Sequence, residues 1–123
     1  MPRSSATAHE LNRVGLLAGL PGETLARLAK AMEREEVPPG TVIVREGEPG
    51  DRFYVVFAGM LSVTQSAPDG RGVLRPGDYF GEVALAMDMP RTATVSAITP
   101  AVVASCDRET FDELIRPLFA DDD

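Results

Sequence analysis

Residues 80–95 read FGEVALAMDMPRTATV. The run from Gly81 to Ala86 is too short for an independent helix, and it suits a single helical turn between two strands. The first backbone N–H groups of any helix lack internal partners and carry partial positive charge, so such a turn favours an anion. Gly81 would let the backbone approach a ligand closely, and Ala84 adds little bulk. The stretch therefore predicts an anion-binding turn.

Two charged side chains in this stretch have complementary chemistry. Pro90 is expected to position Arg91 at the start of the next strand, and a planar guanidinium matches two oxygens of a phosphate. Glu82 is poorly suited to lie beside a phosphate, but it can accept hydrogen bonds from sugar hydroxyls. Together they indicate a nucleotide-like ligand. The alternative is that Arg91 and Glu82 form a structural ion pair.

The composition limits the classes of function. The chain has 123 residues and a formal net charge of -7, which suits one domain with a modest core. Only 12 Lys and Arg residues, thinly spread, argue against a nucleic-acid surface and against docking on anionic lipid. No apolar run approaches the roughly 20 residues of a membrane span, and no signal peptide begins the chain. We expect no nucleic-acid partner and no direct membrane contact.

Cysteine and histidine usage narrows the classes further. The single cysteine, Cys106, lies in the apolar run AVVASC and is predicted to be a core residue. It cannot form an internal disulfide, so we expect a cytoplasmic protein or the cytoplasmic domain of a larger one. The single histidine, His9, leaves no set for a metal site or a nucleophilic triad. The sequence thus predicts a protein that is not an enzyme and carries no metal or cofactor.

Helices are predicted at the two ends of the chain. Thr7 and Glu10 fit a capping box for a short first helix. Residues 21–32 have apolar side chains at i, i+3, i+4 and i+7 and predict a second helix, with the charged run 33–36 as its polar exit. Asp107 is a good N-cap for a third helix over 107–118, in which Pro117 interrupts the pattern.

Strands are predicted between these helices. Turn signals recur about every 8–12 residues from residue 37 onward, a rhythm typical of sandwiches and barrels. The strand-like runs between them are TVIVR (41–45), RFYVVF (52–57), MLSVTQ (60–65), GVLR (72–75), TATVSA (92–97) and AVVASC (101–106). The predicted fold is mainly β with flanking helices (α+β), an antiparallel jelly-roll β-barrel or double-stranded β-helix.

The motif F-G-E-x-A-L-x4-P-R-[AST]-A-[TS]-V, met at every position by residues 80–95, is similar to the phosphate-binding cassette of cyclic nucleotide-binding domains. These are regulatory domains of cAMP- and cGMP-dependent kinases, nucleotide-gated channels and sensors like the catabolite activator protein. Residues 11–29 resemble the family's N-terminal helical segment, and residues 40–59 resemble its paired strands. The resemblance covers roughly residues 11–118 and implies that the ligand is cAMP or cGMP.

The resemblance also implies roles for individual residues. Arg91 would clamp the cyclic phosphate, aided by the backbone N–H groups of Ala84 and Thr92. Glu82 and the backbone of Gly81 would bind the ribose 2′-hydroxyl.

The remaining assignments concern the base. Val63 and Leu74, on neighbouring strands, would form an apolar wall against the purine, and Val83 and Ala93 complete the predicted ligand-binding set. A hydroxyl at Thr92 often accompanies cGMP in the family, because it can reach the guanine amino group. The Val-, Ala-, Gly-, Arg- and Pro-rich texture resembles bacterial sequences of high GC content, which favours cAMP.

The chain departs from the family in one respect. The lid helix that usually closes the pocket is not encoded before Asp123, and neither is a helix-turn-helix. We expect a loose leader over 1–10, a cyclic nucleotide-binding domain over 11–119 and an acidic tail over 120–123. The leading hypothesis is a regulatory domain that couples ligand binding to helix movement in an effector, attached in cis or supplied in trans. The alternatives are a degenerate module of the same fold that no longer binds nucleotide, and an enzyme of related shape.

Overall fold

The structure is a computed structural model that describes residues 4–66 and 69–119. The predicted acidic tail over 120–123 lies outside the described residues, as do the first three residues of the predicted leader.

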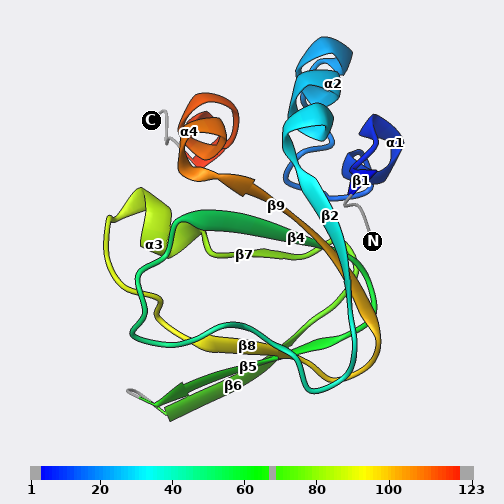
Figure 1. The fold of residues 1–123 in the computed structure, drawn as a ribbon. Helices are drawn as coiled ribbons and strands as arrows, with labels where there is room; N and C mark the ends of the chain where they lie inside the picture. Colours follow the sequence, from blue (N-terminus) through cyan, green and yellow to red (C-terminus); the bar gives the residue numbers. More distant parts are fainter. Residues whose placement is uncertain (1–3, 67–68, 120–123) are drawn as a thin grey trace.

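Two antiparallel sheets face each other (Figure 1). The five-stranded sheet has the order β1 (Ser4–Ser5), β2 (Glu33–Val37), β9 (Ala101–Asp107), β4 (Arg52–Ala58) and β7 (Tyr79–Phe80). The four-stranded sheet has the order β3 (Val42–Val44), β8 (Thr94–Ala97), β5 (Leu61–Ser66) and β6 (Asp69–Leu74). The predicted mainly-β antiparallel fold is confirmed, and the jelly-roll label describes these facing sheets approximately.

The alternation of side chains along β4 explains why the five-stranded sheet carries two cores. Phe53 and Val55 are fully buried against the helices on its outer face. Val56 is fully buried on the opposite face and packs between the sheets, where Tyr54 also lies. Successive side chains of a strand point to opposite faces, so one strand supplies both cores.

The helices divide into two groups (Figure 1). Those at the two ends of the chain, α1 (Ala8–Leu11), α2 (Gly22–Ala31) and α4 (Arg108–Thr110), pack near the outer face of the five-stranded sheet. The helix α3 (Glu82–Ala86) lies instead at one end of the two sheets, between β7 and β8 in the chain. This is the single turn predicted from residues 81–86.

The predicted helix starts are confirmed. The Thr7 hydroxyl accepts a hydrogen bond from the backbone N–H of Glu10, and the Glu10 carboxylate accepts one from the N–H of Thr7. Asp107 Oδ1 accepts a hydrogen bond of 2.9 Å from the N–H of Thr110. Each of these side chains satisfies a backbone donor that the helix itself cannot.

The last helix is less regular than predicted. After α4 the chain continues as a π-helical turn, Phe111–Ile115, and then as a 3-10 turn, Arg116–Phe119. Pro117 has no N–H to donate to the preceding turn, which disfavours a continuous α-helical ladder through this segment.

The charged run 33–36 was predicted to be the exit of the second helix, and this prediction is wrong. It forms strand β2, whose residues pair with β9 from Glu33↔Ser105 to Val37↔Ala101. Glutamate has low strand propensity, but a full ladder to a buried central strand overrides that preference.

Two further strands without a sequence signal are β1 and β7. Residues 4–10, within the predicted leader, hold β1 and the start of α1.

No helix in the described parts of the chain has the combined length and apolar character needed to cross a membrane.

Candidate ligand-binding site

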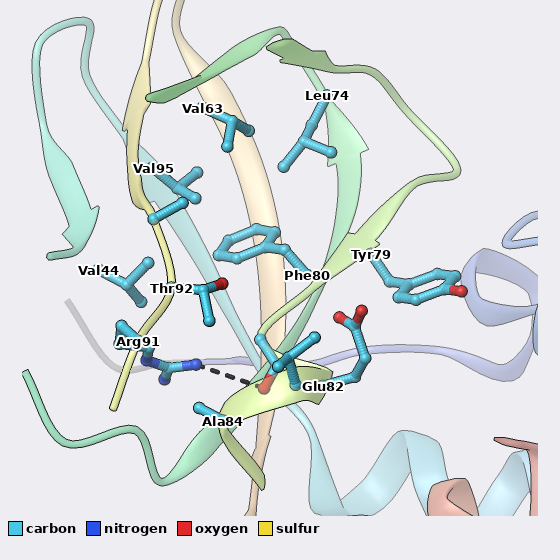
Figure 2. Close-up of a pocket in the computed structure, with 13 residues that line it drawn as sticks. Val44, Val63, Leu74, Tyr79, Phe80, Glu82, Ala84, Arg91, Thr92 and Val95 are labelled. Carbon is cyan, nitrogen blue, oxygen red and sulfur yellow. Dashed lines mark hydrogen bonds between the residues drawn. The ribbon is translucent and has the colours of Figure 1, made fainter. Parts of the chain in front are cut away.

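A pocket of about 190 Å³ opens between the two sheets beside α3 (Figure 2). It brings together every residue that the sequence assigned to ligand binding. The lining residues are Val44, Val63, Leu74, Tyr79, Phe80, Gly81, Glu82, Val83, Ala84, Arg91, Thr92, Ala93 and Val95.

Gly81 is the N-cap of α3, and only glycine fits there. Its φ angle is +96°, in the left-handed region. A Cβ atom at this position would lie 2.8 Å from the carbonyl oxygen of Arg52 and 2.8 Å from Nη1 of Arg91. The missing side chain therefore allows the start of α3 and its free N–H groups to lie against the guanidinium.

Arg91 is the principal charged group of the pocket, and the residue is only 7% exposed. Its Nη2 donates a hydrogen bond of 3.0 Å to the backbone carbonyl of Arg52, and its Nη1 one of 3.5 Å to that of Gly81. The guanidinium carbon also lies 5.8 Å from the centre of the Tyr54 ring. Burial lowers the pKa of Arg91, because removal from water disfavours the charged form.

The main chain of Arg91 is anchored as firmly as its side chain. Its N–H donates to the carbonyl of Glu48, and its carbonyl accepts from the N–H of Gly47, both at 2.8 Å. Nearby, a Cβ atom on Gly50 would lie 2.7 Å from Arg91 Nε and 2.7 Å from Ala84 Cβ. The loop over 47–50 thus fixes the cation next to the first turn of α3.

Arg91 forms no salt bridge with any residue in the described ranges. The alternative prediction of a structural ion pair between Arg91 and Glu82 is therefore wrong. Figure 2 shows the Glu82 carboxylate and the Arg91 guanidinium pointing to different sides of the first turn of α3. Because a buried cation is costly unless an anion compensates it, this arrangement favours an anionic ligand.

Two other polar groups of the pocket lack partners in the described part of the chain. The half-buried Glu82 carboxylate makes no hydrogen bond there and remains an acceptor. The backbone N–H of Thr92 likewise donates to no described residue, next to the guanidinium in sequence. The pocket therefore offers a cation and a donor for an anion, with a separate acceptor for hydroxyl groups.

The opposite side of the pocket is apolar. Val63 on β5 and Leu74 on β6 line the pocket and lie above its charged end in Figure 2. The structure adds Val44, Tyr79, Phe80 and Val95, which the sequence analysis did not assign to ligand binding. Val44 and its neighbour Ile43 both pack on the core between the sheets, and the β3–β8 register shifts between Val42 and Val44, so strand alternation in the sequence does not single out Val44.

The core between the two sheets contains an aromatic stack. The rings of Tyr54 and Phe80 are 4.7 Å apart and nearly parallel, with an interplanar angle of 1°. Their strands pair directly, as Tyr54↔Phe80. Burial raises the pKa of Tyr54, and the nearby charge of Arg91 opposes this shift.

Among the described residues no group of three or more His, Cys, Asp or Glu side chains could hold a metal ion.

Sequence comparison identifies a family. Residues 34–117 match the model described as the cyclic nucleotide-binding domain. The chain is 42% identical over 109 residues to a cAMP-dependent protein kinase regulatory subunit of Yarrowia lipolytica, and this match covers 88% of the chain and 29% of the relative. It is 35% identical over 103 residues to a CRP-like cAMP-activated global transcriptional regulator of Mycobacterium tuberculosis, covering 80% of the chain and 46% of the relative.

These relatives come from a eukaryote and a bacterium, so they do not support the bacterial origin predicted from amino-acid texture. The chain spans less than half the length of each of them, so it corresponds to one part of a longer relative.

Solved structures of regulatory domains and subunits are also similar to this chain. The regulatory domain of Toxoplasma gondii PKA in complex with cAMP has a TM-score of 0.85 and 34% identity, covering 90% of the chain and 44% of that structure. A regulatory subunit of a cAMP-independent protein kinase A from Trypanosoma cruzi, bound to guanosine, has a TM-score of 0.81 and 28% identity, covering 89% of the chain and 40% of that structure. With its cassette turn, its buried arginine and these matches, the chain belongs to the cyclic nucleotide-binding domain family.

Proposed function

We propose that this chain binds cAMP in preference to cGMP in the pocket beside α3, and that it acts as a regulatory domain and not as an enzyme. The observation that carries this proposal is Arg91, a buried guanidinium with no salt bridge to any described residue. Asp51 is close enough to favour the charged form of Arg91 but forms no described salt bridge with it. A cyclic phosphate would supply the directly paired anion that Arg91 lacks among the described residues, and the first N–H groups of α3 add to its binding.

The rest of the ligand follows from the geometry of the pocket. With the phosphate at Arg91 and the N–H groups of Ala84 and Thr92, the ribose 2′-hydroxyl would meet Glu82 and the Gly81 backbone. The purine would then pack against Val63 and Leu74, the apolar wall across the pocket.

Two observations support cAMP over cGMP. The Yarrowia lipolytica and Mycobacterium tuberculosis relatives and the Toxoplasma gondii structure carry cAMP in their descriptions. The polar side chains that line the pocket are those of Tyr79, Glu82, Arg91 and Thr92. If Glu82 and Arg91 bind ribose and phosphate, Thr92 is the side chain best placed to meet a guanine amino group, and one hydroxyl is a weak basis for selecting guanine.

Contacts behind α3 support coupling to an effector. The Arg116 guanidinium donates hydrogen bonds of 3.1 Å to the Leu85 carbonyl and 3.3 Å to the Ala86 carbonyl. Arg108 donates one of 3.3 Å to the Leu85 carbonyl. The C-terminal segment therefore holds the end of α3 opposite to the proposed phosphate. A shift of α3 on binding would move this segment, and through it an effector attached in cis or bound in trans, within the cytoplasm.

The second candidate is a domain of this family that does not bind cyclic nucleotide. It is favoured by the similarity to a cAMP-independent kinase subunit bound to guanosine, since the fold alone is compatible with another ligand. Arg91 distinguishes the two candidates, because a neutral nucleoside gives a buried cation no counter-charge.

Isothermal titration calorimetry of the purified chain with cAMP, cGMP and guanosine tests the proposal. We expect saturable binding of both cyclic nucleotides, tighter for cAMP, and weaker or absent binding of guanosine. Tighter binding of guanosine than of cAMP, or no binding of either cyclic nucleotide, would support the second candidate.

A further inference from the structure

A second pocket, of about 170 Å³, shares no lining residue with the first. It lies where the end of α1, strand β2, the end of β4 and the turn before β7 come together. The register between β4 and β9 shifts between Val56 and Ala58, so β4 carries a bulge at this point. The lining residues are Glu10, Arg13, Val14, Arg34, Val56, Phe57, Ala58, Pro76, Gly77 and Val102.

Arg34 is held in this pocket by one of its three guanidinium nitrogens. Its Nε donates a hydrogen bond of 3.1 Å to Oε2 of Glu10. The other Glu10 oxygen, Oε1, accepts from the N–H of Thr7 at 3.1 Å in the capping box. Glu10 is thus committed on both oxygens, and it orients Arg34 without occupying the two terminal nitrogens, which donate to no described residue.

Arg13 supplies a second cation to the same pocket. Its guanidinium is exposed and forms no ion pair or hydrogen bond with any residue in the described ranges. Glu36 lies two residues after Arg34 in β2, on the same face of the strand, and it forms no described salt bridge with Arg34. Glu36 does not line the pocket, so the two arginines share its lining with one acidic residue, Glu10, whose carboxylate is already engaged.

The remaining side chains of the pocket are apolar. Phe57 and Val102 are half-buried at the pocket wall, whereas Val14 and Val56 lie almost fully buried behind it. A compact apolar body could pack on Phe57 and Val102 while an attached anion meets the two arginines. Pockets for small molecules have this combination of apolar walls and a few fixed polar groups.

We propose that this pocket binds a small organic oxyanion, a carboxylate or phosphate carried on a compact apolar group. The free edge of the Arg34 guanidinium forms the bidentate contact, Arg13 adds a second positive charge, and Glu10 is the positioning residue for Arg34. The proposal rests on contacts outside the cyclic nucleotide pocket and does not depend on what that pocket binds.

The test uses benzoate and phenyl phosphate as probes, with benzyl alcohol as the neutral analogue, followed by amide and arginine Nε–H NMR shifts of the full chain. We expect saturable shifts at Val14, Phe57 and Gly77 and at the Nε–H of Arg34. The dissociation constant should be on the order of 1 mM, as suits a ligand of so few atoms. Benzyl alcohol should produce no saturable shift there. Phenyl phosphate could also bind in the first pocket. That binding would shift NMR signals of residues near Arg91, which are different residues from those of the second pocket.

Three variants sharpen the test. Arg34→Gln should weaken benzoate binding at least tenfold. Arg34→Lys keeps the positive charge but loses the planar guanidinium, so its benzoate affinity should lie between those of Arg34→Gln and the unaltered chain. Arg45→Gln removes another exposed arginine, outside this pocket, and should change nothing. If Arg34→Gln fails to fold, Arg13→Gln serves in its place, with an expected loss of about threefold. The proposal is overturned if benzoate shifts none of the pocket amides, if benzyl alcohol shifts them equally, or if the folded arginine variants bind like the unaltered chain.

Discussion

The guanidinium of Arg91 donates a hydrogen bond of 3.0 Å to the backbone carbonyl oxygen of Arg52. The acceptor belongs to β4, the strand that pairs with both β7 and β9 in the five-stranded sheet. A main-chain carbonyl can orient a guanidinium without neutralising its charge, whereas a carboxylate would do both. The cation is thus fixed in place and still available to an anion.

The first prediction concerns this cation. Arg91→Ala should reduce cAMP affinity by roughly 10²–10³, since loss of one partner of a buried charge pair costs about 3–5 kcal/mol. The domain should stay folded, because the variant also removes a desolvated charge. Calorimetry measures the affinity and circular dichroism the fold. Arg45→Ala, at an exposed position, is the control and should bind normally. Binding of the Arg91 variant within threefold of the unaltered chain would contradict the site assignment.

The second prediction concerns the ribose. Glu82→Gln should weaken cAMP binding less than Arg91→Ala does, because a hydrogen bond from a hydroxyl to a carboxylate contributes about 1.5–3 kcal/mol and the amide keeps one acceptor. The same change should have little effect on 2′-deoxy-cAMP, which lacks the hydroxyl. Competition binding with both nucleotides measures the difference. Equal losses for the two ligands would remove Glu82 from this role.

The third prediction concerns Gly50, whose missing side chain leaves room for the cation. A Cβ there would lie 2.7 Å from Arg91 Nε and from Ala84 Cβ, both closer than van der Waals contact. Gly50→Ala should therefore displace the guanidinium, weaken cAMP binding more than tenfold and destabilise the fold by about 1–3 kcal/mol.

The matched control for this change is Gly22→Ala. Nothing lies within 4 Å of a Cβ at Gly22, in the first turn of α2. This variant should bind like the unaltered chain and unfold at the same or a slightly higher denaturant concentration. If both alanine variants bind equally well, Gly50 has no part in placing Arg91.

The fourth prediction concerns the choice of base. If the Thr92 hydroxyl meets a guanine amino group, Thr92→Ala should weaken cGMP selectively and shift the cAMP/cGMP affinity ratio by about 1 kcal/mol, the net value of one hydrogen bond. Titrations of both nucleotides against both proteins give the ratio. An unchanged ratio would leave Thr92 with only its backbone N–H as a contact.

The fifth prediction concerns pH. Burial raises the pKa of the Cys106 thiol from its ordinary value of 9.0 to about 12. The folded protein therefore holds this proton more tightly than the unfolded chain does, and the resulting stability is complete below pH 9 and declines as the pH rises from there toward 12. Urea unfolding at pH 8 and at pH 10.5 gives the free energy of unfolding at each pH. Between these two pH values, this free energy should fall more for the unaltered chain than for Cys106→Ala. Equal losses would show that the thiol does not contribute.

The local features of this protein could be predicted from the sequence, because the groups that determine them lie a few residues apart. The capping box at Thr7 and Glu10 and the N-cap at Asp107 each depend on a side chain three residues from its partner. The turn of α3 and the alternation along β4 are similarly local. Residues 80–95 also contain the arginine, the glutamate and the small residues of the pocket, so its chemistry was predictable before its shape.

The tertiary structure decided the features that depend on distant residues. The run 33–36 became a strand because β9, some seventy residues later, offers a full ladder of hydrogen bonds. Val44 joined the pocket wall because β3 pairs with β8. Whether Arg91 would find a carboxylate, and whether Arg34 would keep free donors, depended on packing that no local pattern encodes. Propensity and capping act within one or two turns, whereas burial and charge pairing depend on which segments meet once the chain has folded.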